Sequence, residues 1–234
     1  MVNVGRGAAL LTAVVVLAGC STSTSGSATK SAISSAARTS VSAAPGFDVS
    51  RLDQLIGALP AGFVPVPLSA PIKVNQQLLP TVGTVVSYGQ AFTVDPPQCR
   101  PLLKPVDGQV GADSHHVRGD ELEKRSISIG AENPVSVPAE IPSAGCELFT
   151  YAVDQKEHPM KGTVNRLEGP VIDGATTVAL KFDVEGFPNV EYSYAAIVDG
   201  RVYVDVQARL APEFPAEPVL SALLIKAVAA VAGK

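Results

Sequence analysis

Four consecutive residues, Asp113-Ser114-His115-His116, carry every type of side chain that a serine hydrolase needs. A catalytic triad is normally assembled from residues far apart in the sequence, because neighbours along a chain rarely reach the required geometry. No GxSxG motif accompanies these residues, and two histidines are too few ligands to define a metal site. We therefore expect a solvated surface loop here. A hydrolase that uses His115 or His116 is the third of three hypotheses about function.

A second group of residues could form a binding surface. Asp199-Gly200 is a residue pair typical of a type I′ turn, and it separates two runs of alternating polarity. A two-residue turn pairs Val198 with Arg201 and so fixes which side chains share a face. One face then collects three tyrosines: Tyr192, Tyr194 and Tyr203. Because tyrosine combines contact area with a hydrogen-bonding hydroxyl, we predict ligand binding there, the alternative being that a helix or loop covers the rings.

The N-terminal residues predict export. Arg6 adds a positive charge, residues 8–18 are apolar apart from Thr12, and small residues precede Cys20. This pattern is typical of a secretory signal, and the apolar run is too short to span a bilayer comfortably. The segment Leu17-Ala18-Gly19-Cys20 resembles the bacterial lipobox, which implies removal of residues 1–19 and lipidation of Cys20. The alternative is an ordinary signal peptide with an accidental cysteine.

Residues 20–46 follow as the lipidated cysteine and a tether. The segment after Cys20 consists almost wholly of Ser, Thr, Ala and Gly, with Lys30 and Arg38 as its charged residues. Such a composition cannot form a core, so we predict a disordered linker that keeps a folded domain, residues 47–234, clear of the membrane.

The cysteine count agrees with this interpretation. The protein has three cysteines, Cys20, Cys99 and Cys146. If Cys20 is lipidated, Cys99 and Cys146 remain to form a disulfide, and the oxidising environment of an exported protein favours this bond. Closing a loop of about 48 residues would stabilise the fold by roughly 4 kcal/mol in the chain-entropy model.

Charge and motif content exclude several classes of function. Residues 47–234 hold all 22 acidic residues and 15 of the 18 basic ones, a net charge of -7. Such a domain lacks the basic footprint of a nucleic-acid binder and is not attracted to anionic lipid surfaces. The sequence contains no P-loop, dinucleotide fingerprint, HExxH or EF-hand pattern. We therefore expect no cofactor, no metal and no catalytic residue.

The elements that must position these residues can be read from hydrophobic periodicity. Helical spacing predicts a first helix over residues 48–59 and a last helix over residues 216–232. Polar character predicts a loop over residues 108–120. In addition to the hairpin around Asp199-Gly200, strands are predicted at residues 84–94, 126–130, 147–154 and 175–184. The expected fold class is α+β: an antiparallel β-sheet with N- and C-terminal helices and one disulfide, in a single domain.

Three short segments carry a resemblance to a known group of proteins. They are residues 55–63 (LIGALPAGF), residues 95–106 (DPPQCRPLLKPV) and Ala144-Gly145-Cys146. These segments resemble mycobacterial lipoproteins of unknown function, which are similar to the extracellular sensor domain of the mycobacterial serine/threonine kinase H. The resemblance implies an antiparallel sheet with helices, a cleft and disulfides. The kinase sensor domain has two disulfides, whereas this chain offers one pair at most, and the family supplies no catalytic residues to carry over.

Together these observations predict an exported protein, anchored through Cys20 to the outer face of a bacterial cell membrane or envelope. The first hypothesis is a non-enzymatic domain that binds a small or lipidic ligand in a cleft of the sheet. That version predicts a concave pocket near the tyrosines, whereas the second hypothesis, an envelope protein partner, predicts an exposed flat patch there.

Overall fold

The computed structural model describes a part of the chain with three gaps: residues 46–67, 69–122, 125–154 and 160–234. The expected signal peptide, Cys20 and all of the expected tether except Gly46 lie outside the described residues. The described residues form mostly an antiparallel β-sheet with a C-terminal helix, so the helical content is lower than the expected α+β class suggests.

One sheet of ten strands dominates the described residues, and every pairing in it is antiparallel. In the order in which they lie side by side, the strands are β1 (Val64–Pro65), β4 (Asp107–Asp120), β5 (Ser126–Ser136), β10 (Val202–Leu210), β9 (Val190–Val198), β8 (Ala175–Val184), β7 (Met160–Leu167), β6 (Leu148–Val153) and β3 (Phe92–Asp95), and β2 (Ile72–Lys73) pairs with β4. The strands predicted at residues 126–130, 147–154 and 175–184 are confirmed as β5, β6 and β8, although β5 continues to Ser136.

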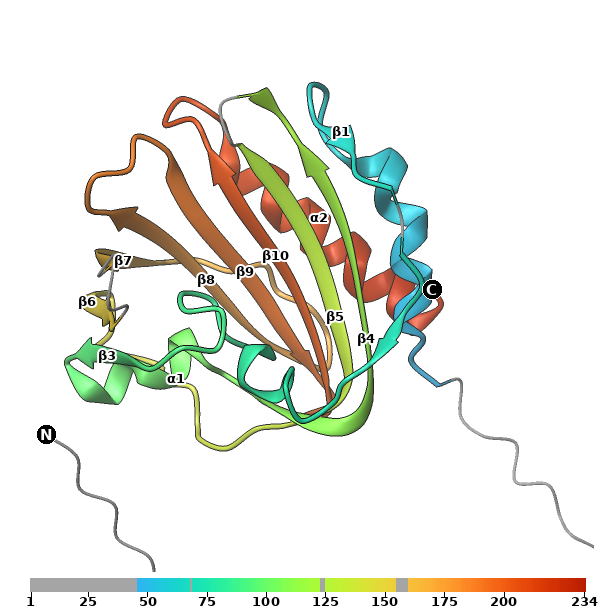
Figure 1. Cartoon of the computed structure of the whole chain (residues 1–234), viewed down its shortest axis with the longest axis horizontal. Helices are drawn as coiled ribbons and strands as arrows, with labels where there is room; N and C mark the ends of the chain where they lie inside the picture. The colour runs from blue at the N-terminus through green and yellow to red at the C-terminus, as the bar shows by residue number, and fades with distance from the viewer. Residues whose placement is uncertain (1–45, 68, 123–124, 155–159) are drawn as a thin grey trace, which may run out of the picture. The chain divides into compact units, whose positions relative to one another are not determined.

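Two helices cover one face of this sheet. The C-terminal helix α2 (Ala216–Ala232) crosses behind the strands, and the 3₁₀ helix η1 (Val49–Ala58) lies beside it (Figure 1). Both predicted helices are therefore present, the first as a 3₁₀ helix. The Asp48 side chain caps η1 by accepting a hydrogen bond from the Ser50 N–H at 3.0 Å. The Asp48 N–H donates to the Val231 carbonyl at 3.0 Å, which fastens η1 to the end of α2.

The largest hydrophobic core lies between these helices and the sheet. It joins buried residues of η1 and α2 to the alternate residues of β5, β9 and β10 that face them. Leu52, Leu220 and Leu224 are fully buried in this core. Within the described residues, no helix has the length and apolar character needed to span a membrane.

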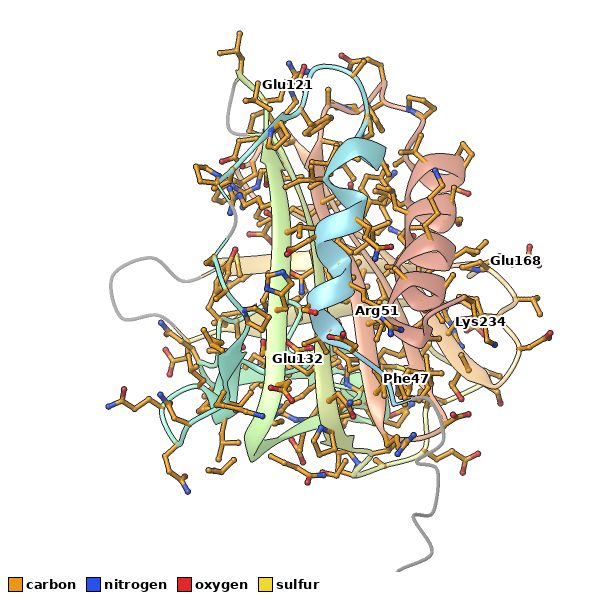
Figure 2. All side chains as sticks on the ribbon, turned by 90° about the vertical axis from the view of Figure 1, so that its right-hand side faces the viewer. Phe47, Arg51, Glu121, Glu132, Glu168 and Lys234 are labelled. Carbon is orange, nitrogen blue, oxygen red and sulfur yellow. A yellow bond between two sulfur atoms is a disulfide. The ribbon has the colours of Figure 1, made fainter. Side chains whose placement is uncertain are left out.

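A second layer of irregular chain covers part of the opposite face. It contains the short helical turns η2 (Leu79–Thr81), η3 (Pro97–Cys99) and α1 (Arg100–Leu103), together with the edge strand β3 (Figures 1 and 2). Most of the strand predicted at residues 84–94 is absent, and only Phe92–Asp95 is extended and paired. Tyr88 and Gly89 explain this difference, because their positive φ angles of 47° and 85° turn the chain.

The expected disulfide joins this layer to the segment before β6. Cys99 and Cys146 are bonded, with Cα atoms 5.6 Å apart, and both residues are fully buried. Leu102, Phe149 and Tyr151 pack with them in a second apolar cluster. The bridge therefore ties the covering layer to the sheet.

The loop predicted for residues 108–120 is wrong, because these residues form β4. The strand carries polar side chains on both faces, and each face has its own polar partners. One face carries His115, which is buried and lies 2.6 Å from the Asp53 carboxylate of η1 (Nε2 to Oδ1). The other face carries Ser114 and His116, which point away from the helices toward side chains of β5. A strand with partners on both faces lacks the alternation on which sequence prediction depends.

The turn predicted at Asp199-Gly200 is confirmed. Both residues have positive φ angles, 50° and 66°, and the Arg201 N–H donates to the Val198 carbonyl at 3.1 Å. The predicted register of the hairpin is wrong, however, because Val198 pairs with Val202. The Arg201 carbonyl accepts a hydrogen bond from the Val135 N–H of β5 at 2.8 Å. Arg201 therefore becomes a third residue of the turn instead of pairing with Val198.

Replacing both half-cystines, Cys99→Ala with Cys146→Ala, should lower the free energy of unfolding by about 4 kcal/mol, since the bridge closes a long loop of the unfolded chain. Urea denaturation of the two proteins measures this difference. The single Cys20→Ala variant is the control, because the bridge does not involve that cysteine. Equal midpoints for the bridged and unbridged proteins would contradict a stabilising role.

Candidate functional site

The face of the sheet opposite the helices carries a group of polar side chains on three neighbouring strands, β4, β5 and β10. The strand register arranges them in rows that run across the sheet. The three rows are Ser114–Glu132–Tyr203, His116–Gly130–Asp205 and Arg118–Ser128–Gln207. We call this surface the polar floor.

The middle row depends on a glycine. A Cβ atom on Gly130 would lie 2.5 Å from Asp205 Oδ1 and 2.6 Å from His116 Nδ1, distances at which neither side chain could stay in place. The absence of a side chain at Gly130 therefore lets the His116 ring and the Asp205 carboxyl group face each other across β5.

Two carboxyl groups are buried in the polar floor. Glu132 and Asp205 are each only 5% exposed. Glu132 Oε1 lies 3.4 Å from His116 Nε2 and accepts a hydrogen bond from the Ser114 hydroxyl at 3.4 Å. Asp205 Oδ2 accepts a hydrogen bond of 2.8 Å from the Gln207 amide. Within the described part of the chain, Glu132 Oε2 and the buried Tyr203 hydroxyl have no hydrogen-bond partner.

The electrostatics of the floor follow from this burial. Desolvation, with the negative charge of Glu132 adding to it, raises the pKa of Asp205 from 3.8 to about 7. Burial opposes a charge on His116, but the hydrogen bond to Glu132 and the charges of Glu132 and Asp205 outweigh it and raise the pKa of His116. Burial also raises the pKa of Tyr203 well above its ordinary value. The His116 ring is therefore easier to protonate, and the Asp205 carboxyl group harder to ionise, than the same groups in water.

A cavity of about 380 Å³ lies over the buried acids. The polar floor forms one side, with Ser114, His116, Glu132 and Asp205. The opposite wall comes from β2 and the chain around η2. Its apolar residues are Ile72, Val74, Leu78 and Val82, and its polar residues are Thr81 and Thr84. An adjoining hollow of about 200 Å³ shares Tyr88, Ser128 and Gln207 with the cavity and continues along the floor toward Arg118 and Arg209. We call the two together the groove.

Tyr88 stands at the junction of the two hollows. Its side chain is 82% exposed, and its φ angle of 47° lies in the left-handed region that non-glycine residues seldom occupy. Strained backbone of this kind is often found at ligand-binding positions. Because Tyr88 lines both hollows, its ring is placed to contact a molecule in the groove.

A larger hollow of about 930 Å³ lies beside the turn between β9 and β10. Among the described residues that line it, Glu140 is the only charged one, and the others include Gly174, Ala175 and Gly200. This surface offers few side-chain groups for recognition, so the groove is the better candidate site.

The structure separates the three tyrosines that were expected to share a face. Tyr192 and Tyr194 lie on the helix face, in the core beneath α2, and are 8% and 0% exposed. Tyr192 also lines the smaller hollow of the groove. Tyr203 lies on the opposite face beside Glu132. The added residue Arg201 explains the error, because a shift of one residue moves every side chain of a strand to the other face.

The two histidines also separate. His115 faces η1, whereas His116 belongs to the polar floor and contacts Ser114 through its Nε2 atom at 3.3 Å. In a catalytic triad the two ring nitrogens contact different groups, the serine on one side and the acid on the other. Here the Ser114 hydroxyl and Glu132 both approach Nε2, whereas Nδ1 faces Asp205 across Gly130. The second acid beside Nε2 is what departs from a triad.

Sequence reasoning missed Glu132, Asp205 and Tyr88 as site residues. A signal for Asp205 was available, since it is an acid within the valine-rich run of β10. Glu132 carries no such signal. It joins Asp205 only because β5 pairs with β10, and that pairing connects residues far apart in the sequence.

Replacing Asp205 with Asn should make the protein's stability less dependent on pH. Because the folded-state pKa of about 7 lies above the ordinary value of 3.8, the folded protein retains a proton that the unfolded chain loses between these values. The contribution of Asp205 to stability therefore falls as pH rises from about 4 to 7. Asn cannot ionise and still accepts the Gln207 hydrogen bond.

Thermal unfolding at pH 5 and pH 8 measures this effect. The quantity to compare is the melting temperature of Asp205→Asn minus that of the unmodified protein. This difference should be several degrees higher at pH 8 than at pH 5, since 1 kcal/mol corresponds to about 2–4 °C in a domain of this size. The exposed Asp173→Asn serves as the control and should show no such change. A difference between Asp205→Asn and the unmodified protein that is the same at both pH values would contradict the burial argument.

Comparisons with known proteins bear on the fold and the family. The X-ray structure of an uncharacterized protein from Mycobacterium smegmatis, described as an Rv0999 ortholog, is similar with a TM-score of 0.58 and 23% identity. The similarity covers 81% of this chain and 100% of that one, and at this identity it shows the fold alone. No curated protein matches. The resemblance to the kinase sensor domain stays a prediction. A family model described as a domain of unknown function, DUF5642, matches residues 48–232, and the chain therefore belongs to that family.

Proposed function

We propose that this protein is an exported, lipid-anchored envelope protein that binds a small or lipidic ligand in the groove and catalyses no reaction. The observation that carries the proposal is the pair of carboxyl groups, Glu132 and Asp205, buried at the bottom of a cavity with one oxygen unpartnered. Acids in such a position cost folding free energy, and perturbed groups of this kind cluster at functional sites.

The shape and lining of the groove support ligand binding. Small-molecule sites are concave, have volumes of roughly 300–1,000 Å³, and combine apolar walls with a few polar groups. The cavity of about 380 Å³ has this character, with its apolar wall facing the acids of the floor. A molecule with a polar end and an apolar body would contact both sides at once.

The two alternative functions have weaker support. A protein partner was expected to bind an exposed tyrosine patch, but Tyr192 and Tyr194 are buried under α2. A hydrolase needs a nucleophile that a base activates and an oxyanion hole, and here Glu132 lies beside the same His116 nitrogen as the Ser114 hydroxyl. The backbone around Ser114 lies within the paired strands β4 and β5, where amide groups serve the sheet.

Native mass spectrometry tests the ligand-binding proposal. The full chain, purified in detergent from a mycobacterial host, should carry an additional mass that denaturation removes. Ser128 lines both hollows, so Ser128→Trp should fill the groove and reduce the fraction of protein that carries this mass by at least about half.

Thr150→Trp is the matched control, since it places the same ring on an exposed position of β6. Both variants should keep the Cys99–Cys146 bridge and a cooperative melting transition, which shows that they fold. An unmodified protein without any additional mass, or a mass that persists in Ser128→Trp, would contradict binding in the groove.

A separate experiment tests the anchor. Cys20→Ala should move the protein from the membrane pellet to the supernatant after high-speed centrifugation, since a chain without the thiol cannot receive the acyl chains that hold it. Ser21→Ala is the control and should remain in the pellet. Equal pelleting of all three proteins would exclude anchoring through Cys20.

A further inference from the structure

We infer that the polar end of the ligand is an organic ammonium group, which binds between Glu132 and Asp205 while its carbon chain lies against the apolar wall of the groove. The inference rests on the proposed function and names the class of ligand that the same site would accept. It follows from the charges of the floor, the unpartnered oxygen and the chemistry of the opposite wall.

The charges of the floor do not balance. Two carboxyl groups face one imidazole, and the His116 Nε2 atom approaches Glu132 Oε1. Asp205 accepts a hydrogen bond from an uncharged amide, that of Gln207. At a pH above the Asp205 pKa of about 7, when both acids are ionised, the floor carries an excess negative charge in a largely buried place even if His116 is protonated. A bound cation removes this excess, whereas an anion would add to it.

The hydrogen-bonding groups of the floor also favour a donor. Glu132 Oε2 is buried, belongs to a residue that lines the cavity, and meets no donor among the described residues. An ammonium group carries three N–H donors and no acceptor, so it can donate to Glu132 and Asp205 together. A charge-assisted hydrogen bond of this kind is stronger than a bond between neutral groups.

An inorganic cation fits the same place less well. In the part of the chain that the structure describes, no group of three or more His, Cys, Asp or Glu side chains is arranged to hold a metal ion. The wall opposite the acids is mostly aliphatic, and the hydroxyl groups of its two threonines, Thr81 and Thr84, already donate to the carbonyls of Leu78 and Pro80. The same wall suits the carbon chain of an alkylammonium, whose transfer from water is favourable.

Tyr88 extends this argument to the mouth of the groove. Its exposed ring lines both hollows and can contact either the carbon chain or the positive end of a passing ligand. Aromatic rings attract cations through their negatively charged faces, so Tyr88 favours the same ligand class as the acids of the floor.

Calorimetric titration with three six-carbon probes tests the inference. Hexylammonium, hexan-1-ol and hexanoate have the same chain and differ in the charge of the polar end. Each is titrated at pH 8 into the full chain in non-ionic detergent, with a titration into detergent alone as the blank. Hexylammonium should bind at least about tenfold more tightly than hexan-1-ol, and hexanoate should bind most weakly.

Two variants locate the binding group. Glu132→Gln and Asp205→Asn keep the shape of each side chain, remove its charge, and should each weaken hexylammonium binding about tenfold or more while leaving hexan-1-ol unchanged. Glu168→Gln is the matched control, because Glu168 is exposed and lies far from Glu132 in the view of Figure 2. Its affinity for hexylammonium should equal that of the unmodified protein.

The outcomes separate this inference from the proposed function. Equal affinity for hexylammonium and hexan-1-ol, or affinity that survives both amide variants, overturns the ammonium assignment. If Ser128→Trp then abolishes binding of either probe, the groove remains the binding site. Absence of binding by all three probes also overturns the ammonium assignment, and the additional mass in native spectra decides the proposed function independently.

Discussion

The candidate site depends on the absence of a side chain at Gly130, in the middle of the polar floor. The strands β4, β5 and β10 bring His116, Gly130 and Asp205 into one row, and any Cβ atom at the centre would collide with both outer side chains. Two strands that are not neighbours can therefore interact across a third. Glu132, one row further along, then adds the second acid, so the charged group is a product of strand register and one missing side chain.

The two faces of the sheet have different tasks, and this division allows acids to be buried at all. The helix face is almost wholly apolar and contains the largest core, which supplies most of the favourable burial. The covering layer on the other face is fixed by the Cys99–Cys146 bond and by its own apolar clusters. Stability from these regions offsets the cost of placing Glu132 and Asp205 in the polar floor.

Much of the fold could be predicted from sequence because its signals are local. The helix at Ala216–Ala232, the turn at Asp199-Gly200 and the pairing of Cys99 with Cys146 all follow from short patterns or from parity. The site could not be predicted in the same way. One additional residue, Arg201, is held by a hydrogen bond from Val135, and this contact between strands reverses the face on which Tyr203 lies.

The polar character of β4 has the same origin as the site itself. A strand that reads as a loop does so because both of its faces have polar partners, Asp53 for His115 and Glu132 for His116. Partners of this kind are separated by many residues, so they become visible only after the strands are paired. Replacing such a group by apolar side chains of similar volume would often leave a protein equally stable or more so. In our proposal the floor retains two acids, an imidazole and an unpartnered oxygen beside a cavity because they recognise a ligand. The fold then supplies the free energy that holds these groups in place before the ligand arrives.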